Sequence, residues 1–367
     1  MAGEAGRRPD GGIYASRAKP NVVAGVGEPG GPTLEALNAV DAGLAWLARA
    51  QEADGRWSCK RWDGSGDWDL GITGLALEAF LAAGHTHKQG EFRANVARAL
   101  DWLKLIQKPD GSFPWKVFYE QGIATIPLCE AYGMTKDPDL KPFAQKAIDN
   151  ICKQQPTHGG FRYQGGAENV IGDLSISGWQ MTAIANARCA GLEVPEANFD
   201  RSLVFLKSTY CGNGGSAYVP GAGVNPSFSM TAAGMFCRQF LGGPEAEVAA
   251  GAKWLRDYAD RALDRGELDF SKNLYTTYYT CLAMFQMGGD SWTRWNKWFR
   301  DPVVKAQVQE RLDADGRYIR GSWDPAKEAF GKGAGRVYTT AMALLCLETY
   351  SRYARFYKTT VKGPTDF

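Results

Sequence analysis

The sequence has few of the features that mark several large classes of protein. Among its 367 residues there are 3 histidines and 8 cysteines, and no two cysteines form a Cys-x-x-Cys pair. This spacing does not suggest a disulfide framework, so we expect reduced cysteines buried in a core. No stretch approaches the roughly 20 consecutive apolar residues of a membrane span. The first residues lack the apolar core of a secretory signal. These features favour a cytoplasmic protein, with at most peripheral contact to a membrane.

An excess of charge of one sign is also missing. The 42 Lys+Arg and 40 Asp+Glu residues give a net charge of +2, and no basic run interrupts this balance. A nucleic-acid partner is therefore not expected. The hydrophobic content of 44% suits an ordinary globular core and excludes collagen-like or wholly disordered chains. Because no segment alternates apolar and polar residues as a strand does, we expect an all-α fold.

A repeat of about fifty residues organises the chain. An amphipathic helix ends in a turn of the form Gln-x-x-x-Gly-x-aromatic, and a more apolar helix follows. The first copy of this turn is Gln51, Gly55 and Trp57. Further copies are Gln107, Gly111 and Phe113, then Gln155, Gly159 and Phe161, with weaker ones expected at Gly215, Gly266 and Gly316. This period is typical of arrays of helix pairs.

The two helices of each unit differ in character. Residues 39–51 place apolar side chains on one stripe, as a half-exposed outer helix does. The second helices are apolar nearly all round, which indicates burial on several sides. They are expected at 71–84, 122–134, 177–192, 229–243, 274–289 and 336–353. Six such hairpins predict an (α/α)6 barrel, or toroid, over residues 32–358, with flexible tails at 1–31 and 359–367.

The three strongest turns carry a resemblance to a known family. The segments QEADGRW, QKPDGSF and QPTHGGF resemble the repeats of squalene-hopene cyclases and prenyltransferase β-subunits, over roughly residues 33–358. The resemblance implies a single-barrel relative of the class II terpene cyclases. Such enzymes are isomerases that protonate a linear isoprenoid in a central apolar cavity and use no cofactor. The expected partner is then a hydrophobic, isoprenoid-like small molecule.

Candidate acids lie at the starts of the inner helices. The family's Asp-x-Asp-Asp motif does not occur, and the nearest match is Asp67 and Asp69 in DWDLGIT. Asp173 and Glu120 precede the next inner helices. Two close carboxylates can share a proton, so Asp69 with Asp67 or Asp173 is the expected acid. Each carboxylate also suits a helix N-cap, and a ring of acids could bind a cationic ligand.

Aromatic residues at the same level could line an isoprenoid cavity and stabilise carbocations through their ring faces. They are Trp68, Tyr119, Trp179, Phe228, Tyr275, Tyr278, Tyr279 and Tyr338. No metal site is expected, because His85, His87 and His158 are not on an inner helix with a matching carboxylate and cysteine.

Three functional hypotheses follow from these residues. The first is proton-initiated cyclisation of a linear isoprenoid. The second is a noncatalytic barrel that binds a lipid or peptide in the same cavity. The third is a carbohydrate-active toroid, because paired carboxylates across a ring also suit glycosidic chemistry. The lining of the cavity distinguishes these hypotheses.

Overall fold

The computed structural model describes residues 9–221, 224–265 and 269–357, and its regular structure in these ranges is helical apart from isolated bridges. The inner helices are α2 (Asp69–Ala82), α4 (Tyr119–Thr135), α6 (Leu174–Cys189), α8 (Phe228–Leu241), α10 (Leu274–Met287) and α12 (Gly331–Leu347). The outer helices are α1 (Leu34–Ala50), α3 (Arg93–Ile106), α5 (Lys141–Gln154), α7 (Glu196–Ser208), α9 (Glu245–Asp264) and α11 (Gly289–Lys305). No helix of the described residues is long and apolar enough to cross a membrane.

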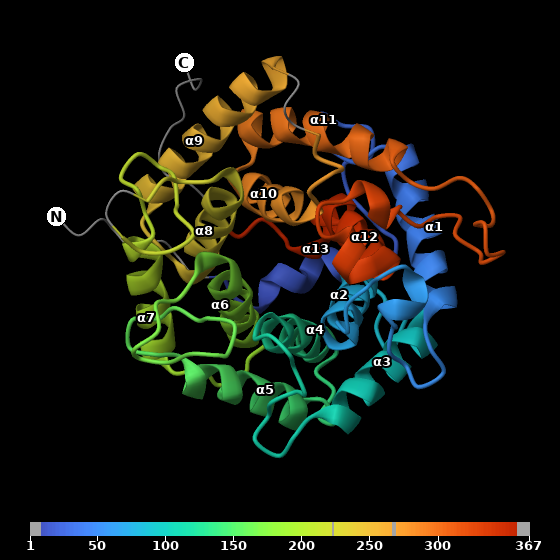
Figure 1. Ribbon diagram of the computed structural model, residues 1–367, viewed down its shortest axis with the longest axis horizontal. Helices are drawn as coiled ribbons and strands as arrows, with labels where there is room; N and C mark the ends of the chain where they lie inside the picture. Colours follow the sequence, from blue (N-terminus) through green and yellow to red (C-terminus); the bar gives the residue numbers. More distant parts are fainter. Residues whose placement is uncertain (1–8, 222–223, 266–268, 358–367) are drawn as a thin grey trace.

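The inner helices form a closed ring. Each contacts the next along the chain, and α12 contacts α2. Figure 1 shows this ring surrounded by the outer helices. Nearly every side chain of α2, from Leu70 to Ala82, is buried, because the helix packs against neighbours on several sides. The all-α barrel predicted from the repeats is therefore confirmed.

The repeat turns join each hairpin to the next one. Gln51 ends α1, and its Nε2 donates to the carbonyl of Gly55 at 2.8 Å and to that of Asn95 on α3 at 2.9 Å. Gly55 has a φ of +100°, and a Cβ there would lie 2.2 Å from the carbonyl oxygen of Arg98 on α3. Glycine is required here because the turn touches the backbone of the next outer helix. The turns thus have a structural role.

Two of the weaker turn assignments are wrong. The fourth turn places Gly214, not Gly215, against a backbone carbonyl of α9. In the sixth, Gln307 Nε2 donates to the carbonyls of Gly321 and of Ala39 on α1, so Gly321 replaces the predicted Gly316. An inserted loop between Gln307 and Gly321 obscured the spacing. The predicted fifth copy, Gly266, lies outside the described residues.

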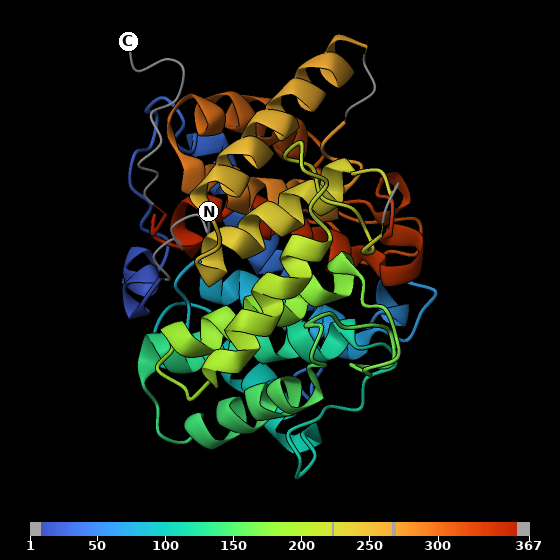
Figure 2. The ribbon, with the colours of Figure 1, turned by 90° about the vertical axis from the view of Figure 1, so that its left-hand side faces the viewer.

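The N-terminal segment from residue 9 onward is part of the fold. The helical turn η1 (Gly11–Arg17) has Ile13 and Arg17 only 2% and 1% exposed. Figure 2 shows this dark blue segment at one end of the barrel, and the loops that precede the inner helices at the other. The segment predicted as a flexible tail over residues 1–31 therefore contains a partly buried helical turn at Gly11–Arg17. Residues 1–8 and 359–367 lie outside the described residues.

Buried charges close the end of the ring that η1 covers. Arg17 Nη1 pairs with Glu130 Oε2 at 2.6 Å, and both side chains are fully buried. Arg352, at the end of the short helix α13 (Thr349–Arg352), pairs with Glu78. The Tyr353 hydroxyl donates to Glu130 Oε1 at 2.6 Å. These contacts join residues of η1 and α13 to the inner helices at this end of the barrel.

Candidate functional site

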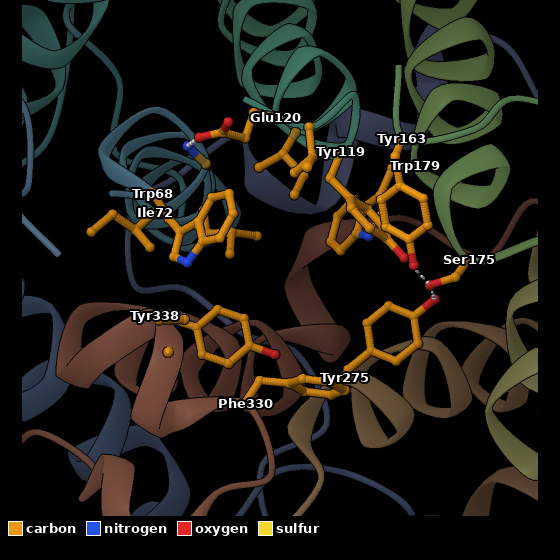
Figure 3. Close-up of a pocket in the computed structure, with 16 residues that line it drawn as sticks. Trp68, Ile72, Tyr119, Glu120, Tyr163, Ser175, Trp179, Tyr275, Phe330 and Tyr338 are labelled. Atoms are coloured by element: carbon orange, nitrogen blue, oxygen red, sulfur yellow. Dashed lines mark hydrogen bonds between the residues drawn. The ribbon is translucent and has the colours of Figure 1, made fainter. Parts of the chain in front are cut away.

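A cavity of about 450 Å³ opens at the end of the barrel where the inner helices begin. This volume lies within the range of small-molecule pockets. Figure 3 shows aromatic rings around most of it. The lining consists of Trp68, Gly71, Ile72, Leu75, Val117, Tyr119, Glu120, Ile123, Tyr163, Ser175, Trp179, Tyr275, Phe330, Gly333, Ala334 and Tyr338.

Glu120 is the one candidate acid that reaches this cavity. It is the second residue of α4 and is 3% exposed. Its Oε1 accepts from the amide of Gly71 at 3.3 Å, and its Oε2 accepts from the amide of Lys116 at 2.8 Å. Burial raises the pKa of Glu120 above its usual value, although these hydrogen bonds act in the opposite direction. The surroundings of Glu120 therefore favour its protonated form more than water does.

Asp67 and Asp69 are not among the residues that line the cavity. Asp67 is 51% exposed and pairs with Lys116 and Lys60. Hydrogen bonds from these lysines lower its pKa to about 2. Asp69 accepts from the amide of Cys59 at 2.8 Å and pairs with Arg56 at 3.1 Å. The expectation that these two aspartates share a proton inside a dry cavity does not match this geometry.

Asp173 is fully buried, but it is not a lining residue either. It is the N-cap of α6, and its Oδ1 accepts from the amide of Ile176 at 2.9 Å. Arg162 lies 3.4 Å from its other oxygen. Burial raises the pKa of Asp173. Its position supports the capping role that the sequence offered as an alternative.

The three carboxylates diverge because they occupy different positions in their helices. Asp173 is an N-cap, Asp69 is the first helical residue of α2, and Glu120 is the second of α4. Successive helical residues are rotated by about 100° around the axis. Side chains at three successive positions therefore cannot all point toward the centre of the ring.

Five of the eight predicted aromatic residues lie at the cavity. Trp68, Tyr119, Trp179, Tyr275 and Tyr338 line the cavity.

The other three predicted aromatics lie behind its wall. Tyr278 stacks on Trp179 with ring centroids 5.3 Å apart, and its hydroxyl accepts from Arg352 at 2.7 Å. Tyr279 packs against Trp179 at 5.6 Å. Phe228 turns outward, and its ring centroid lies 5.2 Å from that of Tyr258 on α9. These three are therefore not among the residues that line the cavity.

The sequence reasoning missed several lining residues. Tyr163 comes from the loop before α6, and Phe330 caps α12. Ser175 lies one helical turn before Trp179, a spacing that places both on one face of α6. The Ser175 hydroxyl accepts from Tyr119 at 2.8 Å and lies 2.8 Å from the hydroxyl of Tyr275. We call Tyr119, Ser175 and Tyr275 the hydroxyl cluster. The i, i+4 spacing of Ser175 and Trp179 is a sequence signal that could have identified Ser175 as a lining residue.

Several solved structures share the architecture. A novel alpha-amylase from Clostridium perfringens matches with a TM-score of 0.59 and 11% identity, over 85% of this chain and 97% of that one. The type II terpene cyclase MstE from Scytonema, in complex with merosterolic acid A, matches with a TM-score of 0.56 and 15% identity, over 86% of this chain and 97% of that one. The alpha-1,6-mannanase GH76A of Salegentibacter sp. HEL1_6, in complex with alpha-1,6-mannotriose, matches with a TM-score of 0.58 and 10% identity, over 86% of this chain and 98% of that one.

At these identities the matches show the fold alone, an α/α toroid that terpene cyclases and carbohydrate-active enzymes share. Comparison with curated proteins finds no significant match. A family model described as "Domain of unknown function (DUF6288)" matches residues 41–232, which is more than half of the chain. The chain therefore belongs to the DUF6288 family.

Proposed function

We propose that the cavity binds a linear isoprenoid and that Glu120 protonates one of its alkenes to start cyclisation. One observation carries this proposal: a cavity walled by aromatic and aliphatic side chains contains the buried carboxyl of Glu120. Apolar walls favour an apolar ligand. Aromatic faces attract cations that approach them. Trp68, Trp179 and Tyr338 offer such faces around the ligand.

The surroundings of Glu120 suit proton donation. Burial favours its neutral form before the reaction. Once the proton has left, the carboxylate keeps the amides of Gly71 and Lys116 as donors. Gly71 is the third residue of α2, so its amide is one of the helix's unpaired first-turn donors. The partial positive charge of the helix start also stabilises the anion.

The proposed step balances without a co-reactant. The O–H bond of Glu120 breaks, and its proton forms a C–H bond at one alkene carbon of the substrate. The cation left at the other alkene carbon is attacked by the next alkene, which closes a ring. Loss of a proton from the cyclic cation to the Glu120 carboxylate restores the acid. The product is an isomer of the substrate.

Carbohydrate chemistry is the competing function, since two of the structural matches act on sugars by their names. Glycoside hydrolysis generally uses two carboxyl groups that flank the scissile bond. Within the described chain, Glu120 is the only carboxyl in the cavity lining. The lining therefore supports the isoprenoid proposal over this alternative.

The test is incubation of the purified protein with linear isoprenoids in D₂O, followed by mass spectrometry of the products. We expect a cyclic isomer that carries deuterium at the protonated carbon. Glu120→Gln cannot donate a proton and should lose this product by at least roughly 100-fold, the scale of general acid catalysis. Release of reducing sugars from an oligosaccharide panel, with no cyclic isoprenoid, would contradict the proposal.

Asp67→Asn is the matched control, because it neutralises a carboxylate that lies outside the cavity lining. We expect this variant to keep its product yield. If Asp67→Asn loses the product while Glu120→Gln keeps it, Glu120 is not the acid, and the Asp67–Asp69 pair suggested by the sequence motif takes its place. Thermal unfolding of both variants shows whether they are folded.

A further inference from the structure

The hydroxyl cluster is a polar patch in an otherwise largely apolar wall. Tyr119, Ser175 and Tyr275 come from α4, α6 and α10, so the ring closure brings them together. Figure 3 shows the cluster and Glu120 at different sides of the cavity. Burial raises the pKa of Tyr119 and of Tyr275, so the patch carries no charge.

Counting protons shows that the cluster has a donor to spare. Three hydroxyls carry three protons, and the two hydrogen bonds between them use two. Tyr119 donates to Ser175. If Ser175 then donates to Tyr275, the proton of Tyr275 is free; in the reverse case the proton of Ser175 is free. Within the described residues no other group accepts from these hydroxyls, so the spare proton is available to an acceptor in the cavity.

Cations are not part of the lining that the structure describes. Of the cations within two residues of the lining in the sequence, Lys116 pairs with Asp67, Arg162 with Asp173 and Arg336 with Asp63, while Lys332 is exposed at the surface. A diphosphate group placed inside the cavity would therefore lose its hydration without gaining a counter-charge. The free-energy cost of removing water from the diphosphate is far larger than the free energy gained from contact with an apolar wall.

We infer that the ligand is uncharged and carries an acceptor oxygen, such as that of an alcohol, ketone or epoxide, which the hydroxyl cluster binds. This inference rests on the proposed function, because it concerns the same cavity. The oxygen lies at the cluster, and the apolar chain extends along Ile72 and Leu75 toward Glu120. The cluster thereby selects the end of the ligand that remains away from the acid.

The test compares farnesol, farnesene and farnesyl diphosphate, which share one apolar chain and differ at its end. Binding is followed by the intrinsic fluorescence of the protein, since Trp68 and Trp179 line the cavity. We expect farnesol to bind roughly tenfold more tightly than farnesene, the factor for one well-made hydrogen bond. The diphosphate should bind on the order of 100-fold more weakly than farnesol.

Variants test whether the hydroxyl cluster causes the preference for farnesol. Ser175→Ala and Tyr275→Phe should each reduce the preference for farnesol over farnesene to less than about threefold, while farnesene affinity stays the same. Tyr279→Phe is the control, because it makes the same change one turn further along α10, behind the cavity wall. It should keep the full preference, and thermal unfolding checks that each variant is folded.

The outcomes separate the two proposals. Equal binding of farnesol and farnesene, or tighter binding of the diphosphate, overturns the inference but leaves the apolar cavity standing. A preference for farnesol that survives both cluster variants also overturns it. If none of the three compounds binds, the proposed function fails, and the inference fails with it.

Discussion

The closure of the barrel at Gly321 gives a sharp test of the fold. Gly321 has a φ of +90°, and a Cβ there would lie 2.4 Å from the carbonyl oxygen of Ala42 on α1. Gly316 has a φ of +75°, but nothing lies within 4 Å of such a Cβ. Alanine at Gly316 therefore meets backbone strain alone, whereas alanine at Gly321 must also displace the first outer helix.

The expected magnitudes differ enough to be measured. A left-handed conformation costs a non-glycine residue about 1–2 kcal/mol. Forcing extra volume into a packed contact adds about 1–3 kcal/mol. For 367 residues the entropy of unfolding is about 0.8 kcal/mol/K, so each kcal/mol lowers Tm by about 1.3 °C. We expect Gly321→Ala to lower Tm by about 3–6 °C and Gly316→Ala by about 1–3 °C.

The assay is thermal unfolding followed by far-ultraviolet circular dichroism on the two variants and the wild type. Equal losses of Tm in the two variants would refute the assignment of Gly321 as the sixth repeat turn. A larger loss for Gly316→Ala would restore the turn that the sequence spacing indicated. Gly55→Ala serves as a reference, because its Cβ would meet the carbonyl of Arg98 in the same way.

Two further predictions concern buried charges. Arg17→Ala should lower the free energy of unfolding by about 3 kcal/mol, because Glu130 then keeps fewer partners in a buried site. The exposed pair of Arg188 and Glu196 provides the control. Arg188→Ala should lower the free energy of unfolding by under about 1 kcal/mol in the same denaturant titration. The folded-state pKa of Glu120 is raised, so the unfolded chain loses this proton first as the pH rises. Wild type should therefore lose stability relative to Glu120→Gln as the pH rises above about 4.5, and a constant difference between pH 4 and pH 8 in chemical denaturation would contradict the buried acid.

The sequence predicted where along the barrel most of the candidate site lies, but not which side chains point into the cavity. The repeat placed the starts of the inner helices together, so Glu120, Trp68 and Trp179 were found at the correct level of the barrel. The apolar character of the inner helices hid which side faces the centre. A helix that is buried on several sides has no hydrophobic stripe to mark a direction. Phe228 and Tyr278 were therefore assigned to the cavity although they face the packing between helices.

Local sequence alone determined that this chain forms helix pairs joined by glycine turns, because helical periodicity and turn residues act over a few positions. It also determined that one helix of each pair is sheltered. Only the tertiary structure decided that η1 covers one end of the ring and that Glu120 rather than Asp69 reaches the cavity. Those outcomes depend on the rotation of each helix in the ring and on contacts between residues more than one hundred positions apart, such as Arg17 and Glu130. Such contacts have no signature in the spacing of neighbouring residues.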